Sequence, residues 1–285
     1  MEFKQNSELN KFSVGVIISS YNNPAWLEKV LWGLSSQSVQ PDEIVIADDG
    51  SGAETRQLID TFKERLPIKH VWHPDDGFQK CRILNRAVLE TKSDYLIFID
   101  QDCIPRYDFV ETHLRYAAKG FFLSGGVVLL PLELSKGLTE EDIRSQNAFS
   151  LKWLINKGLP VTFKCTKLFR NKPFCLFMNA VTPAKATWNG GNASVLRSDI
   201  LAVNGFNELM KYGGEDREFG ERLVNFGLRS KQIRYSAILL HLDHGRPYRN
   251  AEAIAKNVAI RKKTRQKKII ESPMGLKQYH SGRNI

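Results

Sequence analysis

Hydrophobic and polar positions alternate in blocks along the first hundred residues of the chain. Residues 14–19 (VGVIIS) form a continuous apolar, β-branched run, which is typical of a strand buried on both faces of a parallel sheet. A helix is predicted next, because Asn23 can cap it, Pro24 suits its first turn, and apolar residues recur at helical spacing from Trp26 to Leu34. The alternation continues with strands at 43–47, 68–72 and 95–99 and helices at 53–66 and 79–91. The pattern predicts an α/β fold with a doubly wound, mostly parallel sheet and helices on both faces.

The residues that directly follow three of these strands are unusually polar. They are Ser20-Tyr21-Asn22, Asp48-Asp49-Gly50-Ser51 and Asp100-Gln101-Asp102. Because ligands of doubly wound sheets bind at the carboxyl ends of the strands, we expect these side chains to converge on one site. Neither G-x-G-x-x-G nor G-x-x-x-x-G-K follows the first strand, which disfavours a dinucleotide dehydrogenase and a P-loop enzyme.

Asp100 and Asp102 are two carboxylates spaced i, i+2 beyond the end of an apolar strand. Such a pair can bind a hard divalent cation, manganese or magnesium, through oxygen ligands. Magnesium commonly binds through one or two carboxylates together with substrate phosphates, so the pair can hold a diphosphate without a glycine-rich loop. Taken alone, the same pair can also simply cap a turn.

Five segments together resemble family 2 glycosyltransferases of the GT-A fold, and their order along the chain matches. They are SVGVIISSYN, VIADDGS, IFIDQDC, GGN and GFNELMKYGGEDREFGERL. The last segment is similar to the galactosyltransferase-type C-terminal motif of bacterial chondroitin-type polymerases and β-1,4-galactosyltransferases. The resemblance extends from about residue 13 to about residue 250. It implies a single Rossmann-like GT-A domain over 1–250, with a nucleotide-binding half (12–103) and an acceptor and catalytic half (104–250).

The resemblance also implies where the nucleotide of a sugar donor binds. It places the nucleotide over Ser19, Tyr21 and Asp49, with Asp49 accepting a hydrogen bond from the base and Tyr21 stacking near it. Arg82 and Asn85 would lie beside the nucleotide. Without the resemblance, Tyr21 would be an ordinary strand-end aromatic residue and Asp49 a turn residue.

A metal site is implied in the same way. Asp100 would contact the ribose or the metal, and Asp102 would be the direct metal ligand. One histidine of the segment ILLHLDHGRP would complete the site, with His241 as the first choice and His244 as the second. A zinc pair at this spacing is conceivable, but no third nitrogen or thiolate ligand lies nearby in the sequence.

The remaining site residues lie in the second half of the chain. Gly190 and Gly191 allow backbone amides to approach a ligand closely, although they can also form a plain turn. The resemblance implies that Gly191 and Asn192 bind the donor sugar. It also implies that Asp216 is the general base and that Glu215 binds an acceptor hydroxyl. Without the resemblance, two carboxylates at the start of a helix can simply interact favourably with the helix dipole.

The predicted function is an inverting, metal-dependent transfer of a hexosyl residue. The donor would be a nucleoside diphosphate sugar, UDP-linked by preference, and the acceptor a saccharide hydroxyl in surface polysaccharide or lipopolysaccharide assembly. A glycosidase is disfavoured, because a hydrolase has no use for nucleotide-type strand ends. A binding module that has lost catalysis is the alternative, and its signature would be damage to Asp102 or Asp216, both of which are intact. Residues 133–186 match no motif, and we expect them to shape the acceptor site.

Composition changes this picture mainly at the C-terminus. The formal net charge is +10, and the stretch from Gly245 to Ile285 supplies +9 of it, with eleven Lys and Arg against two Glu. Residues 251–285 are therefore predicted as a basic helix and tail, with six basic residues between Arg261 and Lys268. Anionic lipid headgroups would attract this helix, and a lipid-linked acceptor would suit that arrangement. The alternative is a helix packed on the body of the protein, and nucleic acid is disfavoured because no aromatic residues are interleaved with the charge.

The apolar segments and the cysteines suggest the compartment. The most apolar stretch, 121–134, is interrupted by small and polar residues and is shorter than the ~20 residues that span a bilayer. The first dozen residues do not resemble a secretory signal. The four cysteines, at 81, 103, 165 and 175, are too far apart for metal-finger pairs and are expected as reduced thiols. We therefore expect a cytoplasmic protein, with peripheral attachment to the inner face of the membrane as an option.

Overall fold

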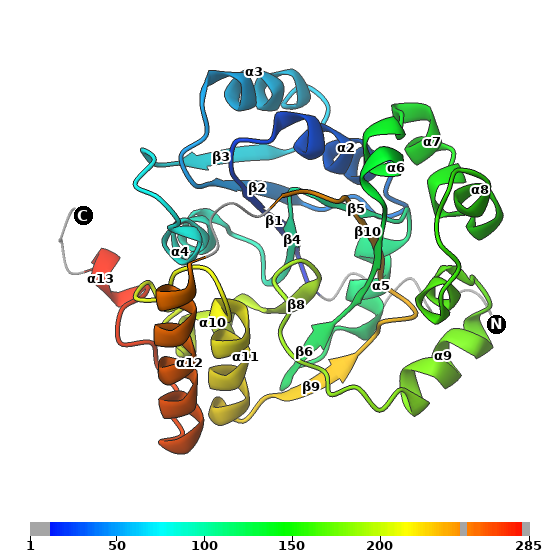
Figure 1. Ribbon diagram of the computed structural model, residues 1–285. Coiled ribbons are helices and arrows are strands. Elements are labelled where there is room, and N and C mark those ends of the chain that lie inside the picture. The colour runs from blue at the N-terminus through cyan, green and yellow to red at the C-terminus, as the bar shows by residue number, and fades with distance from the viewer. Residues whose placement is uncertain (1–11, 246–249, 281–285) are drawn as a thin grey trace.

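A seven-stranded sheet forms the centre of the computed structural model, which describes residues 12–245 and 250–280 of the 285-residue chain (Figure 1). The strand order is β3-β2-β1-β4-β8-β6-β9. The strands are β1 (Val14–Ser20), β2 (Glu43–Asp48), β3 (Ile68–Trp72), β4 (Tyr95–Asp100), β6 (Phe121–Ser124), β8 (Ala193–Leu196) and β9 (Arg229–Gln232). The first four strands pair in parallel, β8 is antiparallel to both β4 and β6, and β9 is parallel to β6. The predicted mostly parallel sheet is thus confirmed, with all four predicted strands.

Helices cover both faces of this sheet. One face carries α2 (Pro24–Ser35), α3 (Ala53–Phe62) and α5 (Phe109–Tyr116), and the other carries α4 (Lys80–Glu90), α10 (Arg197–Ala202) and α11 (Glu215–Phe226). The strands have an apolar side chain for each face: Val16 and Ile18 belong to the first buried cluster, and Ile17 belongs to the second. The Asn23 side chain accepts a hydrogen bond from the Trp26 backbone and caps α2 as predicted.

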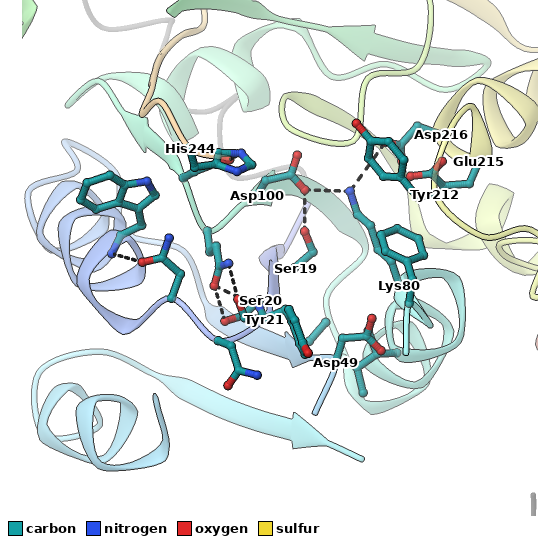
Figure 2. A pocket seen from close by; sticks show the side chains of 18 of the residues that line it. Ser19, Ser20, Tyr21, Asp49, Lys80, Asp100, Tyr212, Glu215, Asp216 and His244 are labelled. Carbon is teal, nitrogen blue, oxygen red and sulfur yellow. Dashed lines mark hydrogen bonds and ion pairs between the residues drawn. The ribbon is translucent and has the colours of Figure 1, made fainter. Parts of the chain in front are cut away.

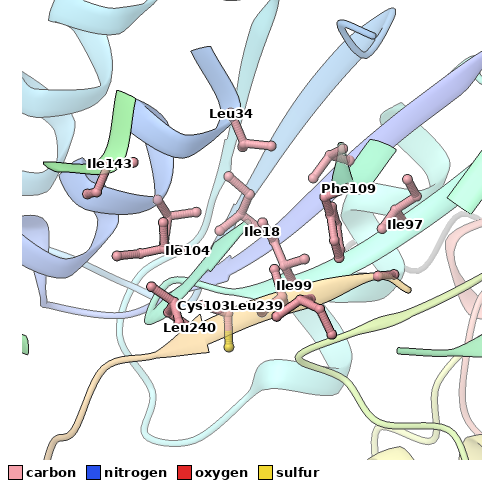
Figure 3. Close-up of a cluster of buried hydrophobic side chains, with 14 of the residues drawn as sticks. Ile18, Leu34, Ile97, Ile99, Cys103, Ile104, Phe109, Ile143, Leu239 and Leu240 are labelled. Carbon is pink, nitrogen blue, oxygen red and sulfur yellow. The ribbon is translucent and has the colours of Figure 1, made fainter. Parts of the chain in front are cut away.

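A second, three-stranded sheet lies against the first. It consists of β5 (Cys103–Pro105), β10 (Ile238–His241) and β7 (Gly126–Leu129), with β10 in the middle. Leu239 and Leu240 of β10 share one buried cluster with Ile18 and Ile99 of the large sheet (Figure 3). The antiparallel register of β5 and β10 pairs Cys103 with His241. Two segments that are far apart in the sequence therefore meet at the end of β4.

Short helices fill the connection between β7 and β8. They are α6 (Leu132–Gly137), α7 (Glu140–Arg144), η1 (Asn147–Phe149), α8 (Leu151–Asn156), η2 (Phe163–Leu168) and α9 (Lys172–Val181). In Figure 1, α6 to α9 lie together on one side of the molecule, beside the small sheet. Among the described residues, no helix combines the length and the apolar character that crossing a bilayer requires. The four cysteines are buried and form no disulfide.

The basic C-terminal segment contains the predicted helix, α12 (Ala251–Gln266), followed by the short α13 (Lys277–His280). In Figure 1, α12 lies alongside α11. Arg261 of α12 forms an ion pair of 2.6 Å with Glu221 of α11, and the Thr264 hydroxyl donates to the carboxylate of Glu218. The helix is thus packed on the body of the protein. The proposed domain boundary at residue 250 stays a prediction.

Candidate active site

A cavity of about 670 Å³ opens at the carboxyl ends of β1, β2 and β4 (Figure 2). The polar strand ends converge there, as the sheet topology requires. The predicted site residues that line this cavity are Ser19, Tyr21, Asp49, Asp100, Asp102, Glu215, Asp216, His241 and His244. Lys80, Phe78 and Tyr212 also line it, and sequence reasoning did not assign a role to any of the three.

A second cavity of about 460 Å³ adjoins the first. The two cavities share four lining residues: Asp100, Tyr212, Glu215 and Asp216. From this common wall the second cavity extends along residues 187–191. A group held in either cavity would therefore lie beside the Glu215-Asp216 pair.

Asp102 and two histidines form one corner of the first cavity. His244 Nε2 lies 2.7 Å and His241 Nε2 3.5 Å from Asp102 Oδ2, because β10 pairs with β5 directly after Asp102. One ligand atom from each residue lies within 4.8 Å of the others, a spacing that suits a single metal ion. Burial would raise the pKa of Asp102, but the hydrogen bond from His244 and the nearby imidazoles lower it. The structure brings both candidate histidines to Asp102, and we call Asp102, His241 and His244 together the Asp102 set.

The nucleotide end of the cavity is formed by β1, β2 and the residues that follow β3. Tyr21 is 41% exposed, and its hydroxyl donates to Asp75 over 2.9 Å. Asp49 is buried; His73 Nε2 lies 2.7 Å from one carboxylate oxygen, and the Gln79 backbone N–H donates to the other over 2.8 Å. These contacts fix the direction of the Asp49 carboxylate, and each oxygen retains a lone pair for a ligand.

The Glu215-Asp216 pair stands at the first turn of α11, after two glycines with left-handed φ angles. Gly213 has φ +110° and Gly214 has φ +96°, values that disfavour any side chain. The turn brings the Gly213 backbone N–H to within 2.7 Å of Glu215 Oε2. The side-chain amide of Asn257, on α12, donates to the carbonyls of residues 211–213 and holds the turn from outside.

Asp216 is held close to Gly190 and Lys80. A Cβ on Gly190 would lie 2.4 Å from the Asp216 carboxylate oxygens, so only glycine fits there. Apart from the nearby Gly190 backbone, no group of residues 12–245 or 250–280 donates to the buried Asp216 Oδ1. Figure 2 shows Lys80 between Asp100 and Asp216, with Nζ 2.8 Å from Asp100 Oδ1 and 3.6 Å from Asp216 Oδ2.

Burial and like charge raise the pKa values of both carboxylates in this pair. Burial and the Asp216 charge raise the pKa of Glu215 to about 7. Burial also raises the pKa of Asp216; Lys80 opposes the increase and Asp100 adds to it. The three surrounding carboxylates outweigh burial at Lys80 and keep its pKa well above the usual value. Lys80 is therefore the cation that limits the increase in the pKa of Asp216.

Three predicted site residues lie elsewhere. Asn192 is fully buried and donates to the carbonyls of Gly126 and Ala237, so its amide serves the packing of the two sheets. Asn85 is also fully buried and exchanges hydrogen bonds with the Phe206 backbone. Arg82 forms a side-chain hydrogen bond with Tyr279 of α13. None of the three lines either cavity, whereas Gly191 lines the second one.

A family model described as glycosyl transferase family 2 matches residues 15–176. The chain belongs to glycosyltransferase family 2. A second model, described as the N-terminal domain of galactosyltransferase, matches residues 180–245, which include the Gly190-Gly191 and Glu215-Asp216 segments.

Curated relatives agree with this membership, and solved structures share the fold. The chain is 25% identical to the chondroitin synthase of Escherichia coli over 266 residues, which cover 87% of this chain and 37% of that protein. Staphylococcus aureus TarS 1-349, solved in complex with UDP, has a TM-score of 0.58 at 14% identity and covers 93% of this chain and 68% of its own. The mannosyltransferase PcManGT of Pyrobaculum calidifontis, in complex with GDP-Man and Mn²⁺, has a TM-score of 0.55 at 17% identity, over 83% of this chain and 59% of its own. The family 2 glycosyltransferase with a GT-A fold, predicted from the motifs, is thus confirmed. The chain spans little more than a third of the chondroitin synthase.

Proposed function

We propose that this chain transfers a hexosyl residue from a UDP-linked sugar to a saccharide hydroxyl with inversion at the anomeric carbon. The observation that carries the proposal is the position of Asp216 in the wall shared by the two cavities. A donor in the first cavity and an acceptor in the second would meet at this carboxylate.

Asp216 would act as the general base. It would accept the proton of the acceptor hydroxyl while that oxygen forms its bond to the anomeric carbon, and the bond from this carbon to the diphosphate breaks on the opposite face. The nucleoside diphosphate departs with the electron pair, and no covalent sugar intermediate is needed. Its raised pKa makes Asp216 a stronger base, and Lys80 keeps enough of it ionised. Glu215, the other carboxylate of the wall, would orient the acceptor hydroxyl.

Asp102, His241 and His244 would hold a divalent metal ion. The three side chains fit such an ion, because their ligand atoms lie within 4.8 Å of one another and His241 Nδ1 is buried without a hydrogen-bond partner in the described part of the chain. A carboxylate with two imidazoles suits manganese better than magnesium, which prefers oxygen ligands. When bound, the metal would neutralise charge on the leaving diphosphate.

The nucleotide would bind between Tyr21 and Asp49, as the family resemblance implies. Asp49 is oriented toward this end by His73 and Gln79, and the exposed Tyr21 ring offers a stacking surface. The complexes of TarS with UDP and of PcManGT with GDP-Man and Mn²⁺ support a nucleotide and a metal in this fold. UDP is preferred over GDP on the resemblance to chondroitin-type polymerases.

A lipid-linked acceptor and a cytoplasmic, peripheral location at the inner membrane complete the proposal. Five of the six basic residues between Arg261 and Lys268 are exposed, three on the packed α12 and two directly after it, so this surface remains available to anionic lipids. Removing everything after Asn250 would also remove the Asn257 contacts behind Glu215. Membrane binding is therefore tested without truncation, by replacing Lys262, Lys263, Lys267 and Lys268 with Gln. Sedimentation with anionic vesicles should then fall, with neutral vesicles as the control and unchanged sedimentation as the contrary result.

A screen of nucleotide sugars with manganese tests the transfer reaction itself. The parent protein should hydrolyse or transfer from one UDP-hexose, and NMR of the early product should show an anomeric configuration opposite to that of the donor. A retained configuration would exclude inversion. Tight metal-dependent UDP binding without turnover for any donor and acceptor would instead indicate the alternative, a binding module.

A further inference from the structure

Three basic side chains line the second cavity on the side away from the donor site. They are Lys167 of η2, Arg217 of α11 and Arg234, which lies between β9 and β10. They come from three separate parts of the sequence, so their proximity is a product of the fold. The acidic residues of this cavity, Asp100, Glu215 and Asp216, all belong to the wall shared with the first cavity.

None of these three cations has an acidic partner in the part of the chain that the structure describes. Lys167 Nζ donates to the Val127 carbonyl and Arg234 Nη2 to the Lys185 carbonyl, each over 3.0 Å. No carboxylate forms an ion pair with Lys167, Arg217 or Arg234 within residues 12–245 and 250–280. Other cations of the protein are neutralised: Lys80 pairs with Asp100, Arg222 with Glu218 and Arg261 with Glu221.

The surroundings also work against these positive charges. Burial lowers the pKa of Lys167, and the charges of Arg234 and Lys164 lower it further. Burial and the charge of Arg217 lower the pKa of Arg234. Residues 145–198, which include much of the wall, contain no Asp or Glu. Unpaired, partly buried like charges are unfavourable, and a bound anion would relieve this cost.

We propose that the second cavity binds an anionic group of the acceptor, a uronic acid carboxylate or a phosphate ester, next to the hydroxyl that is glycosylated. This inference rests on the proposed function, since it names the class of acceptor for the same site. The planar guanidinium of Arg234 suits two parallel hydrogen bonds to such an anion, and the Lys167 ammonium adds a charged donor. The Glu215-Asp216 pair at the other end of the cavity disfavours the anion there, so the acceptor would have a defined direction.

Binding of small saccharides can be measured without turnover. Methyl glucuronide and glucose 6-phosphate, each compared with methyl glucoside, would be titrated calorimetrically into the full chain with UDP and manganese present. We expect at least one anionic ligand to bind about ten-fold or more tightly than the neutral one, the range for charge-assisted hydrogen bonds. Whichever anionic ligand binds more tightly shows whether the cavity prefers a carboxylate or a phosphate. Equal affinity for charged and neutral ligands would overturn the proposal.

Variants then locate the anion. Arg234→Gln and Lys167→Gln should each weaken binding of the anionic ligand about ten-fold and leave that of methyl glucoside unchanged. Lys164→Gln, an exposed residue of the same 3₁₀ helix that does not line the cavity, is the matched control and should change affinity less than about two-fold. If the variants weaken the binding of UDP instead, the cations bind the donor diphosphate and the proposal is wrong.

The outcome for the transfer reaction is separate. If no nucleotide sugar is consumed but anion binding follows Arg234 and Lys167, the proposed activity fails and the anion subsite stands. If transfer occurs and the Arg234→Gln variant shows the parent KM for every acceptor, the subsite fails and the activity stands.

Discussion

Two aspartates at the same end of the sheet, the buried Asp102 and the half-buried Asp216, have opposite surroundings. Asp102 faces His241 and His244, and its pKa is lowered although burial alone would raise it. Burial raises the pKa of Asp216, the charge of Asp100 adds to the increase, and Lys80 opposes the increase without cancelling it. At Asp102 the two histidines outweigh burial, whereas at Asp216 Lys80 does not, so the first aspartate is suited to bind a cation and the second to accept a proton.

Replacing Asp216 should have the largest effect. Asp216→Asn removes the proposed base and should lower the transfer rate by about 10²-fold or more, because general base catalysis typically contributes that much. UDP and manganese affinity should stay near the parent level, since Asp216 does not belong to the Asp102 set. Rate measurements with calorimetry on the same samples check this. A variant that retains more than about a tenth of the parent rate places the base elsewhere.

The equivalent change at the other aspartate should affect binding first. Asp102→Asn should weaken manganese-dependent UDP binding about 100-fold or more. Losing a residue that only hydrogen-bonds to a metal ligand already weakens metal binding by up to about 100-fold, and Asp102 is proposed as a ligand itself. The fold should be retained, because Asp102 lies at the cavity surface. Asp243→Asn, an exposed aspartate between the two histidines, is the matched control. Unchanged calorimetric titrations of Asp102→Asn with UDP and manganese would remove Asp102 from the metal site.

The raised pKa of Glu215 should make the stability of the protein depend on pH. Its folded-state pKa of about 7 lies above the ordinary 4.5, so the folded protein binds this proton more tightly than the unfolded chain does. Stability should therefore fall as pH rises from 4.5 to about 7, by at most about 3 kcal/mol. Glu215→Gln should remove this decrease and be more stable than the parent protein at pH 8, with little difference near pH 4.5.

Urea unfolding of both proteins without nucleotide or metal measures this effect. A constant stability difference at all pH values would show that Glu215 does not titrate in this range. In transfer assays the same variant should raise the KM for the acceptor, in contrast to the loss of rate in Asp216→Asn.

The smallest effect is expected at Lys80. Lys80→Met removes the charge that opposes the rise in the Asp216 pKa, so the acidic limb of the pH–rate profile should move up by about one pH unit. Arg86→Gln on the same helix, a residue outside both cavities, should leave the profile in place. A profile that is lower in rate but unmoved along the pH axis would mean that Lys80 does not act through Asp216.

Some residues of the matched motifs lie outside both cavities. Asn192 follows Gly191 in the GGN segment, yet its side chain turns inward to the carbonyls of Gly126 and Ala237. Asn85 likewise satisfies the Phe206 backbone. A motif records which residue types occur together, whereas the direction of each side chain depends on which neighbours need its hydrogen bonds.

The parallel half of the fold and the residues at its strand ends could be predicted from the amino-acid sequence. The reason is that β1, β2 and β4 are largely apolar strands in regular alternation with helices, and a parallel sheet necessarily gathers the residues after its strands at one edge. The motifs of the second half also identified Asp216 and the two histidines as candidates.

Which of these groups meet depends on tertiary contacts that the sequence does not reveal. The Asp102 set depends on the pairing of β5 with β10, and the three cations of the second cavity come from η2, α11 and the segment after β9. Lys80 reaches Asp216 from a different helix, and no local pattern distinguishes it from an ordinary exposed lysine. Such long-range contacts have no signature in periodicity or propensity, because these report only what neighbours along the chain have in common.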